Sequence, residues 1–245
     1  MGASPGAEDS VYQAAKRGLR AFLGRARELV LAPFGKFGAT PNPEAVYAAV
    51  PVWQAEVDLI MNALTPALQE GWAAAHLGGS YSPSDPYVQA NLALTHNLLV
   101  RVPDEVHAVV IREILAGTDA GEENSAIARR VNDVLDYTGT ENWDNRARVI
   151  ANTETNRHYN SSLLAHALLV ERQDGGGTYT KQWDTRMDGR ERDAHKRANN
   201  QVRTLSQPYS VDGQPLMFPG DPTGSPENVI NCRCSQLIRK SGVPL

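Results

Sequence analysis

Apolar residues recur at helical spacing through most of the chain and at strand spacing only toward its C-terminal end. A stripe between residues 10 and 32 predicts an amphipathic helix; its members are Val11, Ala15, Leu19, Phe22, Leu23, Ala26 and Val30. The same periodicity predicts further helical regions over residues 44–77, 87–100, 103–117, 123–137 and 143–170. Pro51 and Pro66 are expected to kink or divide the first of these regions.

The pattern changes at Gly175-Gly176-Gly177, after which short alternating runs replace the helical stripes. Strands are predicted at 178–180 with Trp183 extending the run, and then at 202–205, 209–211, 216–218 and 229–238. A short charged helix is predicted over 190–199, and Asp212-Gly213 predicts a hairpin turn. The sequence therefore predicts a mainly α N-terminal region and a small C-terminal α+β module with short antiparallel strands and one short helix.

Three parts follow from this reading. Residues 1–43 form a basic amphipathic helix followed by a hinge, residues 44–174 a helical domain, and residues 175–245 the α+β module. The hinge is predicted from Pro33, Gly35, Gly38, Pro41 and Pro43. The helix over 10–32 is interpreted either as docked on the rest with a solvated polar face, or as an arm that contacts a partner, DNA or membrane.

Composition places the chain among globular proteins, because 41% of its residues are hydrophobic and 21% charged. No apolar run is long enough to cross a bilayer. Residues 1–10 lack the apolar core of a signal peptide, which predicts synthesis in the cytoplasm. The net charge of −4 is the balance of +3 over residues 1–36, −11 over 37–145 and +4 over 146–245. Neither basic end is charged enough to indicate a sequence-specific nucleic-acid binder, although weak contacts with phosphates remain open.

The two cysteines, Cys232 and Cys234, are one residue apart, so a disulfide between them would close a small strained ring. Reduced thiols or metal ligation fit this spacing better. His195 supplies a third zinc-ligand type, and Asp188 or Asp184 could complete four. The alternative is a hydrogen-bonded cluster in which the thiols share one face of the last strand and pack toward His195. Zinc is thus a possible cofactor, and the sequence indicates no other.

From Lys181 onward, motifs follow one another in a fixed order. They are Lys181, Trp183, Asp188, Arg190, Arg192, His195, Gln201, the hairpin at Asp212-Gly213, Phe218, Pro219-Gly220-Asp221-Pro222, Pro226 and Asn231-Cys232-Arg233-Cys234. Upstream stand Arg146, Ile150-Ala151-Asn152-Thr153-Glu154 and Asn160. This ordered set resembles the phage Mu F-like minor head protein family, also described as head morphogenesis proteins, over roughly the C-terminal 40% of the chain. Two positions depart from its pattern: Asn152 stands where the family often has Arg, and Asn200 where a Gly often precedes the Gln.

The resemblance implies a minor capsid protein of the virion, inside the head near the portal vertex. It implies a role in head morphogenesis and in DNA packaging or ejection, with no enzymatic activity. The partners it implies are the portal protein and the major capsid or scaffold protein, with non-specific contact to genomic DNA and no membrane. Four residues are expected to form the structural motif of the module: Trp183, Gln201, Phe218 and Asn231.

Basic residues suggest where DNA or the portal would be contacted; these are Lys16, Arg17, Arg20, Arg190 and Arg197. Interleaved acidic residues favour the alternative of a solvated, ion-paired face. A metal-dependent nuclease or effector module carried in the head is the competing function. The sequence argues against it, since His195 is the only histidine after residue 175 and such sites usually need a second histidine or a dense carboxylate cluster.

Overall fold

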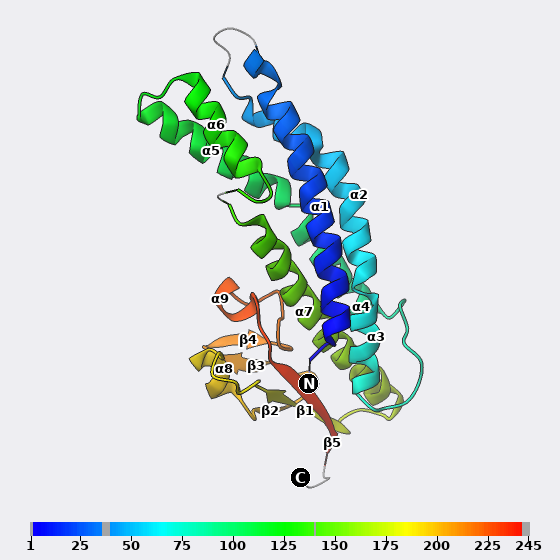
Figure 1. Ribbon diagram of the computed structural model, residues 1–245. Coiled ribbons are helices and arrows are strands. Elements are labelled where there is room, and N and C mark those ends of the chain that lie inside the picture. The colour runs from blue at the N-terminus through cyan, green and yellow to red at the C-terminus, as the bar shows by residue number, and fades with distance from the viewer. Residues whose placement is uncertain (1, 36–39, 140, 242–245) are drawn as a thin grey trace. The chain divides into compact units, whose positions relative to one another are not determined.

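The computed structural model describes residues 2–35, 40–139 and 141–241, which pack as two compact units (Figure 1). Unit 1 comprises Met1–Val11, Ala63–Thr95 and Val149–Leu245, and unit 2 comprises Tyr12–Asn62 and His96–Arg148. Each unit is therefore assembled from stretches that are distant in the sequence. The three-part division inferred from the sequence stays a prediction.

Unit 2 is helical. It contains most of α1 (Pro5–Leu31), the 3₁₀ turns η1 (Ala32–Gly35) and η2 (Pro43–Ala49), α2 (Val50–Ala63), α5 (Val102–Asp119) and α6 (Asn124–Leu135). The apolar stripe of α1 is buried, and in Figure 1 this helix runs beside α2. Phe22 meets Trp53 of α2 with 5.9 Å between ring centroids, and Trp53 Nε1 donates to the Leu99 carbonyl at 2.7 Å. Within unit 2, α1 is thus a core helix whose polar face alone is left for other contacts. Of the predicted hinge residues, Gly38 lies outside the described residues.

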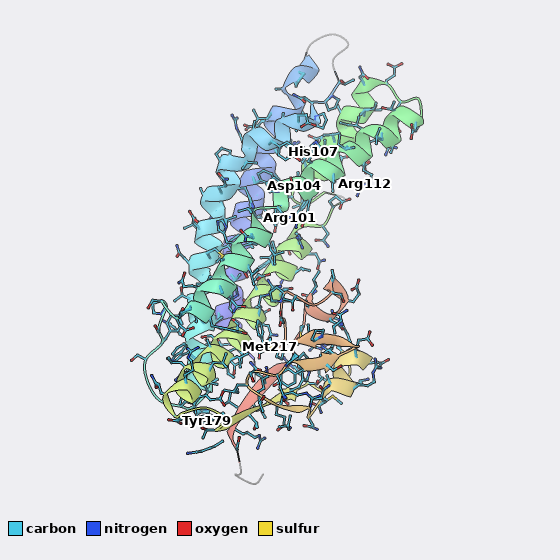
Figure 2. The ribbon with its side chains drawn as sticks, turned by 180° about the vertical axis from the view of Figure 1, so that it is seen from behind. Arg101, Asp104, His107, Arg112, Tyr179 and Met217 are labelled. Atoms are coloured by element: carbon cyan, nitrogen blue, oxygen red, sulfur yellow. The ribbon has the colours of Figure 1, made fainter. Side chains whose placement is uncertain are left out.

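Helix α5 of unit 2 carries the polar residues Asp104, His107 and Arg112, which Figure 2 labels. His107 Nε2 lies 3.2 Å from a Glu44 carboxylate oxygen. Such exposed pairs contribute roughly 0–1 kcal/mol each, so the buried apolar face holds the unit together. None of the helices in the described ranges is both long and apolar enough to span a membrane.

Unit 1 contains α3 (Thr65–Ala74), most of α4 (Pro86–Leu99) and most of α7 (Trp143–Gln173). Pro51 and Pro66 lie in the first turns of α2 and α3, where a missing N–H costs nothing, so Pro66 marks the predicted division of this region. Gly71 of α3 is buried so close to α7 that an added Cβ would stand 2.0 Å from the Tyr159 carbonyl oxygen. The helices therefore meet backbone to backbone at this point.

The middle of α7 is buried although it is rich in polar residues. Between Ala151 and Ala167 every side chain is buried or nearly so. Many of the polar ones donate to backbone carbonyls, either of α7 itself or of other parts of unit 1. Glu154 and Arg157 form a buried ion pair at 2.7 Å, and the Thr95 hydroxyl donates to the same carboxylate. A helix buried on all sides shows no amphipathic stripe, which explains its weak sequence pattern.

The C-terminal part of unit 1 holds two small sheets. Strand β1 (Tyr179–Asp184) is central in an antiparallel sheet of order β2-β1-β5, with β2 (Val202–Thr204) and β5 (Ser235–Lys240) at its sides. Strands β3 (Tyr209–Val211) and β4 (Gln214–Leu216) form a hairpin. Its turn residues Asp212 and Gly213 have φ of +52° and +76°, the left-handed pair of a type I′ turn. Helix α8 (Asp193–Ala198) packs on β3 (Figure 1). The predicted fold class is confirmed.

Two predicted strands were wrong in their bounds. The last strand begins at Ser235 and not at Val229, because residues Pro226–Val229 form a helical turn, α9, with Pro226 in its first turn. The strand predicted over 216–218 ends at Leu216. The Asp221 carboxylate accepts the Met217 N–H at 2.7 Å, which takes that donor out of the β ladder.

Candidate functional site

The site is built around the buried face of β1. Alternation along the strand places Tyr179, Lys181 and Trp183 on this face, and all three are buried. The Trp183 ring meets Tyr209 edge-on at 5.2 Å and His195 edge-on at 5.8 Å between centroids. Trp183 therefore fixes the position of α8 and of its histidine.

His195, Cys232 and Cys234 come together beside Trp183. His195 Nδ1 lies 3.2 Å from Cys234 Sγ and 3.8 Å from Cys232 Sγ, and the three ligand-type atoms all lie within 4.8 Å of one another. All three residues are at most 3% exposed, and neither cysteine forms a disulfide. His195 comes from α8, whereas the thiols come from the segment between α9 and β5. The cluster thus joins two elements that are about forty residues apart.

Neighbouring side chains hold this cluster in place. The Thr185 hydroxyl donates to the His195 carbonyl at 2.7 Å and accepts from Trp183 Nε1 at 3.1 Å. Its oxygen is also 3.7 Å from Cys234 Sγ. From α7, the amides of Asn156 and Asn160 both donate to the Cys234 carbonyl, at 3.0 and 3.1 Å. Two hydrogen bonds therefore anchor the backbone before β5 to α7.

The two thiols differ in acidity. The pKa of Cys234 is held well below that of an ordinary thiol, mainly by a hydrogen bond from Cys232. The hydrogen bond with His195 and the charge of His195 also lower this pKa, whereas burial raises it. The hydrogen bond with Cys234 and burial raise the pKa of Cys232. Cys234 is therefore the more acidic of the two thiols. The other ring nitrogen of His195, Nε2, is buried and has no hydrogen-bond partner among the described residues.

Two cavities border the cluster. A cavity of about 210 Å³ is lined by all three cluster residues together with Arg186, Arg190, Glu191, Arg192, Asn231 and Arg233. A larger one of about 740 Å³ is lined by Cys232, by Asn152, Thr155 and Asn156 of α7, and by residues near the N-terminus. Arginines line both cavities, together with Glu191 in the smaller one and Glu8 and Asp184 in the larger one.

Asp188 does not belong to the cluster. Its carboxylate forms a bidentate pair with Arg233 at 2.5 and 2.9 Å, and Arg186 and Arg190 approach it at 3.3 and 3.5 Å. The hydrogen bond from Arg233 holds the pKa of Asp188 far below its ordinary range. Asp188 thus serves as the acidic centre of an arginine group and lies apart from the three clustered ligand atoms.

The motif residues Gln201, Phe218 and Asn231 each have a definite place. The Gln201 side-chain amide donates to the Ser210 carbonyl at 2.7 Å and accepts from the Ser210 N–H at 3.0 Å. It thus replaces the hydrogen bonds that a neighbouring strand would make. Phe218 is buried against Leu164 of α7. Asn231 has φ of +54° and donates its N–H to the Thr153 hydroxyl at 3.0 Å. The last two residues tie the C-terminal loops to α7.

The five basic residues predicted as DNA or portal contacts have partners in the structure. Four of them form ion pairs with nitrogen-to-oxygen distances between 3.0 and 3.6 Å: Lys16 with Asp144, Arg17 with Glu56, Arg190 with Asp188 and Arg197 with Asp212. The Arg20 guanidinium lies over the Tyr137 ring at 4.6 Å. Their charges are thus partly balanced, as expected of a solvated face.

The Pro-Gly-Asp-Pro loop shows why these residue types occur together. Asp221 accepts bonds from the Met217 N–H and from the N–H and hydroxyl of Thr223. Gly220 has φ of +86°, and its carbonyl accepts Arg157 Nε of α7 at 3.0 Å. The loop therefore docks on α7 through its backbone.

Several residues of the site were missed in the sequence. Asn156 and Arg157 carry no local signal for the site, because the Cys234 and Gly220 carbonyls to which they donate lie 78 and 63 positions away. Thr185 was missed although Trp183 and His195, its partners, are 2 and 10 positions away. The departure at Asn200 has a simple explanation: its φ is +63°, a conformation that asparagine tolerates nearly as well as the usual glycine. Asn152, the other departure, lines the larger cavity.

Comparison with known proteins gives one match. The sequence profile described as "Phage Mu protein F like protein" matches residues 106–237, which is more than half of the chain. The match begins in α5, and so extends further toward the N-terminus than Arg146, the first residue of the motif set. No curated protein and no solved structure matches the chain.

Proposed function

We propose, from the premise that this chain belongs to the phage Mu protein F-like family, that it is a minor head protein located at the portal vertex. Membership of the family indicates a phage protein of head morphogenesis. The finer proposal adds contact with the portal protein and with the capsid or scaffold protein, and a part in DNA packaging or ejection. The observation that carries it is the family match over residues 106–237.

An assembly role fits the chemistry of the described residues better than the nuclease alternative does. Asp188, the best-placed carboxylate, is held ionised by Arg233 and is saturated with hydrogen bonds, so it is a poor general base. His195 is buried against two thiols. A non-enzymatic protein is therefore proposed, in line with its family.

The DNA contact is proposed as weak and non-specific. The basic side chains Lys16, Arg17 and Arg20 of α1 border the same open depression. Each has a partner within the chain, so DNA phosphates would compete with existing ion pairs. Binding should therefore fall steeply as salt is raised.

Asymmetric cryo-electron microscopy of intact heads tests the location. Density for this protein next to the portal, at low copy number, is the expected result. Density in the outer shell lattice or in the tail would refute the proposal. A phage carrying a stop codon in this gene supplies the control, since the density assigned to the protein should disappear from its heads.

A second test addresses function directly. Heads made without the protein should still assemble a shell but should package or deliver DNA poorly, and wild-type protein supplied from a plasmid should restore the yield of infectious particles. A nicking assay with added divalent metals should give equal background for the wild type and for His195→Ala. Metal-dependent nicking that the substitution abolishes would favour the nuclease instead.

A further inference from the structure

We propose that His195, Cys232 and Cys234 bind one zinc ion, with a solvent molecule as the fourth ligand. This inference does not depend on the proposed function, because it rests on the geometry of a buried cluster in unit 1. The three residues carry the ligand atoms that zinc prefers, and they converge from two separate elements.

The spacing of the ligand atoms fits a tetrahedral ion. Zinc–sulfur bonds of about 2.3 Å and zinc–nitrogen bonds of about 2.0 Å, set at tetrahedral angles, separate a sulfur from a nitrogen by about 3.5 Å. His195 Nδ1 lies 3.2 Å from one sulfur and 3.8 Å from the other, on either side of this value. Small movements of the side chains would therefore bring all three atoms to bonding distance.

The surroundings also suit a bound ion. The His195 carbonyl and Cys234 Sγ both lie near the Thr185 hydroxyl, and two asparagine amides fix the Cys234 carbonyl. Contacts of this kind orient the residues that bind the ion in metal sites.

The fourth position is assigned to solvent because of the adjoining cavity. A space of about 210 Å³ is bordered by His195, Cys232 and Cys234 together, and is large enough for water. Asp188 is excluded as the fourth ligand, since Arg233 already takes both of its oxygens. The arginines around the cavity favour a bound hydroxide or another small anion over a second cation.

Metal analysis of the full chain, purified from zinc-replete cells without chelator, tests the proposal. About one zinc per chain is expected, and a chelator should release it and expose both thiols to a thiol reagent. Replacement by cobalt should give sulfur-to-metal charge-transfer bands and the intense visible bands of a tetrahedral site. Chain without stoichiometric metal, which also fails to take up zinc or cobalt on titration, would overturn the proposal.

Variants identify the ligands. Cys232→Ser, Cys234→Ser and His195→Gln should each lose stoichiometric zinc, and a serine variant that still accepts cobalt should show weaker charge-transfer bands. Two matched controls should keep the metal: Asp188→Asn, and His166→Gln, which alters another buried histidine of unit 1. Loss of metal from Asp188→Asn would overturn the assignment of the fourth position. Retention of metal by all three ligand variants would overturn the site.

The ligand variants could fail to fold, so circular dichroism accompanies each measurement. In that event the wild-type chain decides the matter: after chelation it should regain about one cobalt per chain, with the spectrum of mixed nitrogen and sulfur ligation. Rebound cobalt without charge-transfer bands would exclude the cysteines and refute the proposal.

Discussion

Lys181 provides the sharpest quantitative prediction. It lies on the buried face of β1 with no exposed surface, and its ammonium donates to the Met217 carbonyl at 2.7 Å, above the Tyr209 ring. Figure 2 labels Met217 among the strands of unit 1. Burial lowers the pKa of Lys181 from 10.5 to about 7, with a smaller opposing effect of Asp221. Folding therefore requires either a costly buried charge or the loss of a proton.

The sign of the pH dependence follows from proton binding. Between pH 7 and pH 10.5 the unfolded chain keeps a proton on Lys181 that the folded chain releases. Stability thus rises with pH in this window, because the unfolded state binds more protons. Each unit of pKa difference is worth about 1.4 kcal/mol, which gives a gain of about 3 kcal/mol between pH 7 and pH 9.5 from this group alone.

The substitution Lys181→Met removes this contribution while keeping the length of the side chain. Denaturant unfolding of both proteins at pH 7 and pH 9.5 gives a difference in unfolding free energy at each pH. The difference should shift by about 3 kcal/mol in favour of the wild type at the higher pH. Other titrating groups cancel, since both chains carry them.

Lys196→Met is the matched control, because the Lys196 side chain is 44% exposed on α8. Its difference from the wild type should stay constant between the two pH values. A shift below about 1 kcal/mol for Lys181→Met, or an equal shift for both variants, would show that Lys181 is not a perturbed buried group.

Two further predictions concern packing and charge. Gly71→Ala should destabilise unit 1 by more than about 3 kcal/mol, because the added Cβ would overlap the backbone of α7. Gly24→Ala, with open space around it, should stabilise α1 by about 0.5–1 kcal/mol. Equal effects of the two substitutions in thermal denaturation would refute the close approach of α3 and α7. Glu154→Gln should lower the free energy of unfolding by about 3–5 kcal/mol, because it leaves Arg157 buried without its charge partner. Glu28→Gln, in an exposed pair, should lower it by less than about 1 kcal/mol. Similar losses for both variants in urea denaturation would show that the Glu154 pair is solvated.

Elements with a clear local pattern were predictable. The stripe from Val11 to Val30 and the Asp212-Gly213 turn each depend on residues close in sequence, and the structure confirms both. The segment before β5 misled the prediction because Val229 and Ile230 favour a strand by type. Its path is set by Asn231, whose left-handed backbone is held by Thr153, a residue of α7 that is 78 positions away.

The candidate site was predictable in part for the same reason. Residue type and spacing singled out His195, Cys232 and Cys234, and the structure brings them together. Asp188 was grouped with them by type alone. Its true partner, Arg233, lies 45 positions along the chain, and no local pattern reports such a pairing. The buried polar residues of α7 could not be recognised from the sequence, since their partners lie on α3, on α4 and in loops near the end of the described chain.

The division of unit 1 into three stretches has a consequence for how the protein is made. Its strands are the last part of the described chain to leave the ribosome, whereas the α3 and α4 helices that share its core are made far earlier. Contacts of such long sequence separation form late and slowly. The apolar surface of α3 and α4 therefore stays uncovered until α7 and the strands have been synthesised. During that interval the nascent chain is most exposed to aggregation and most in need of a chaperone.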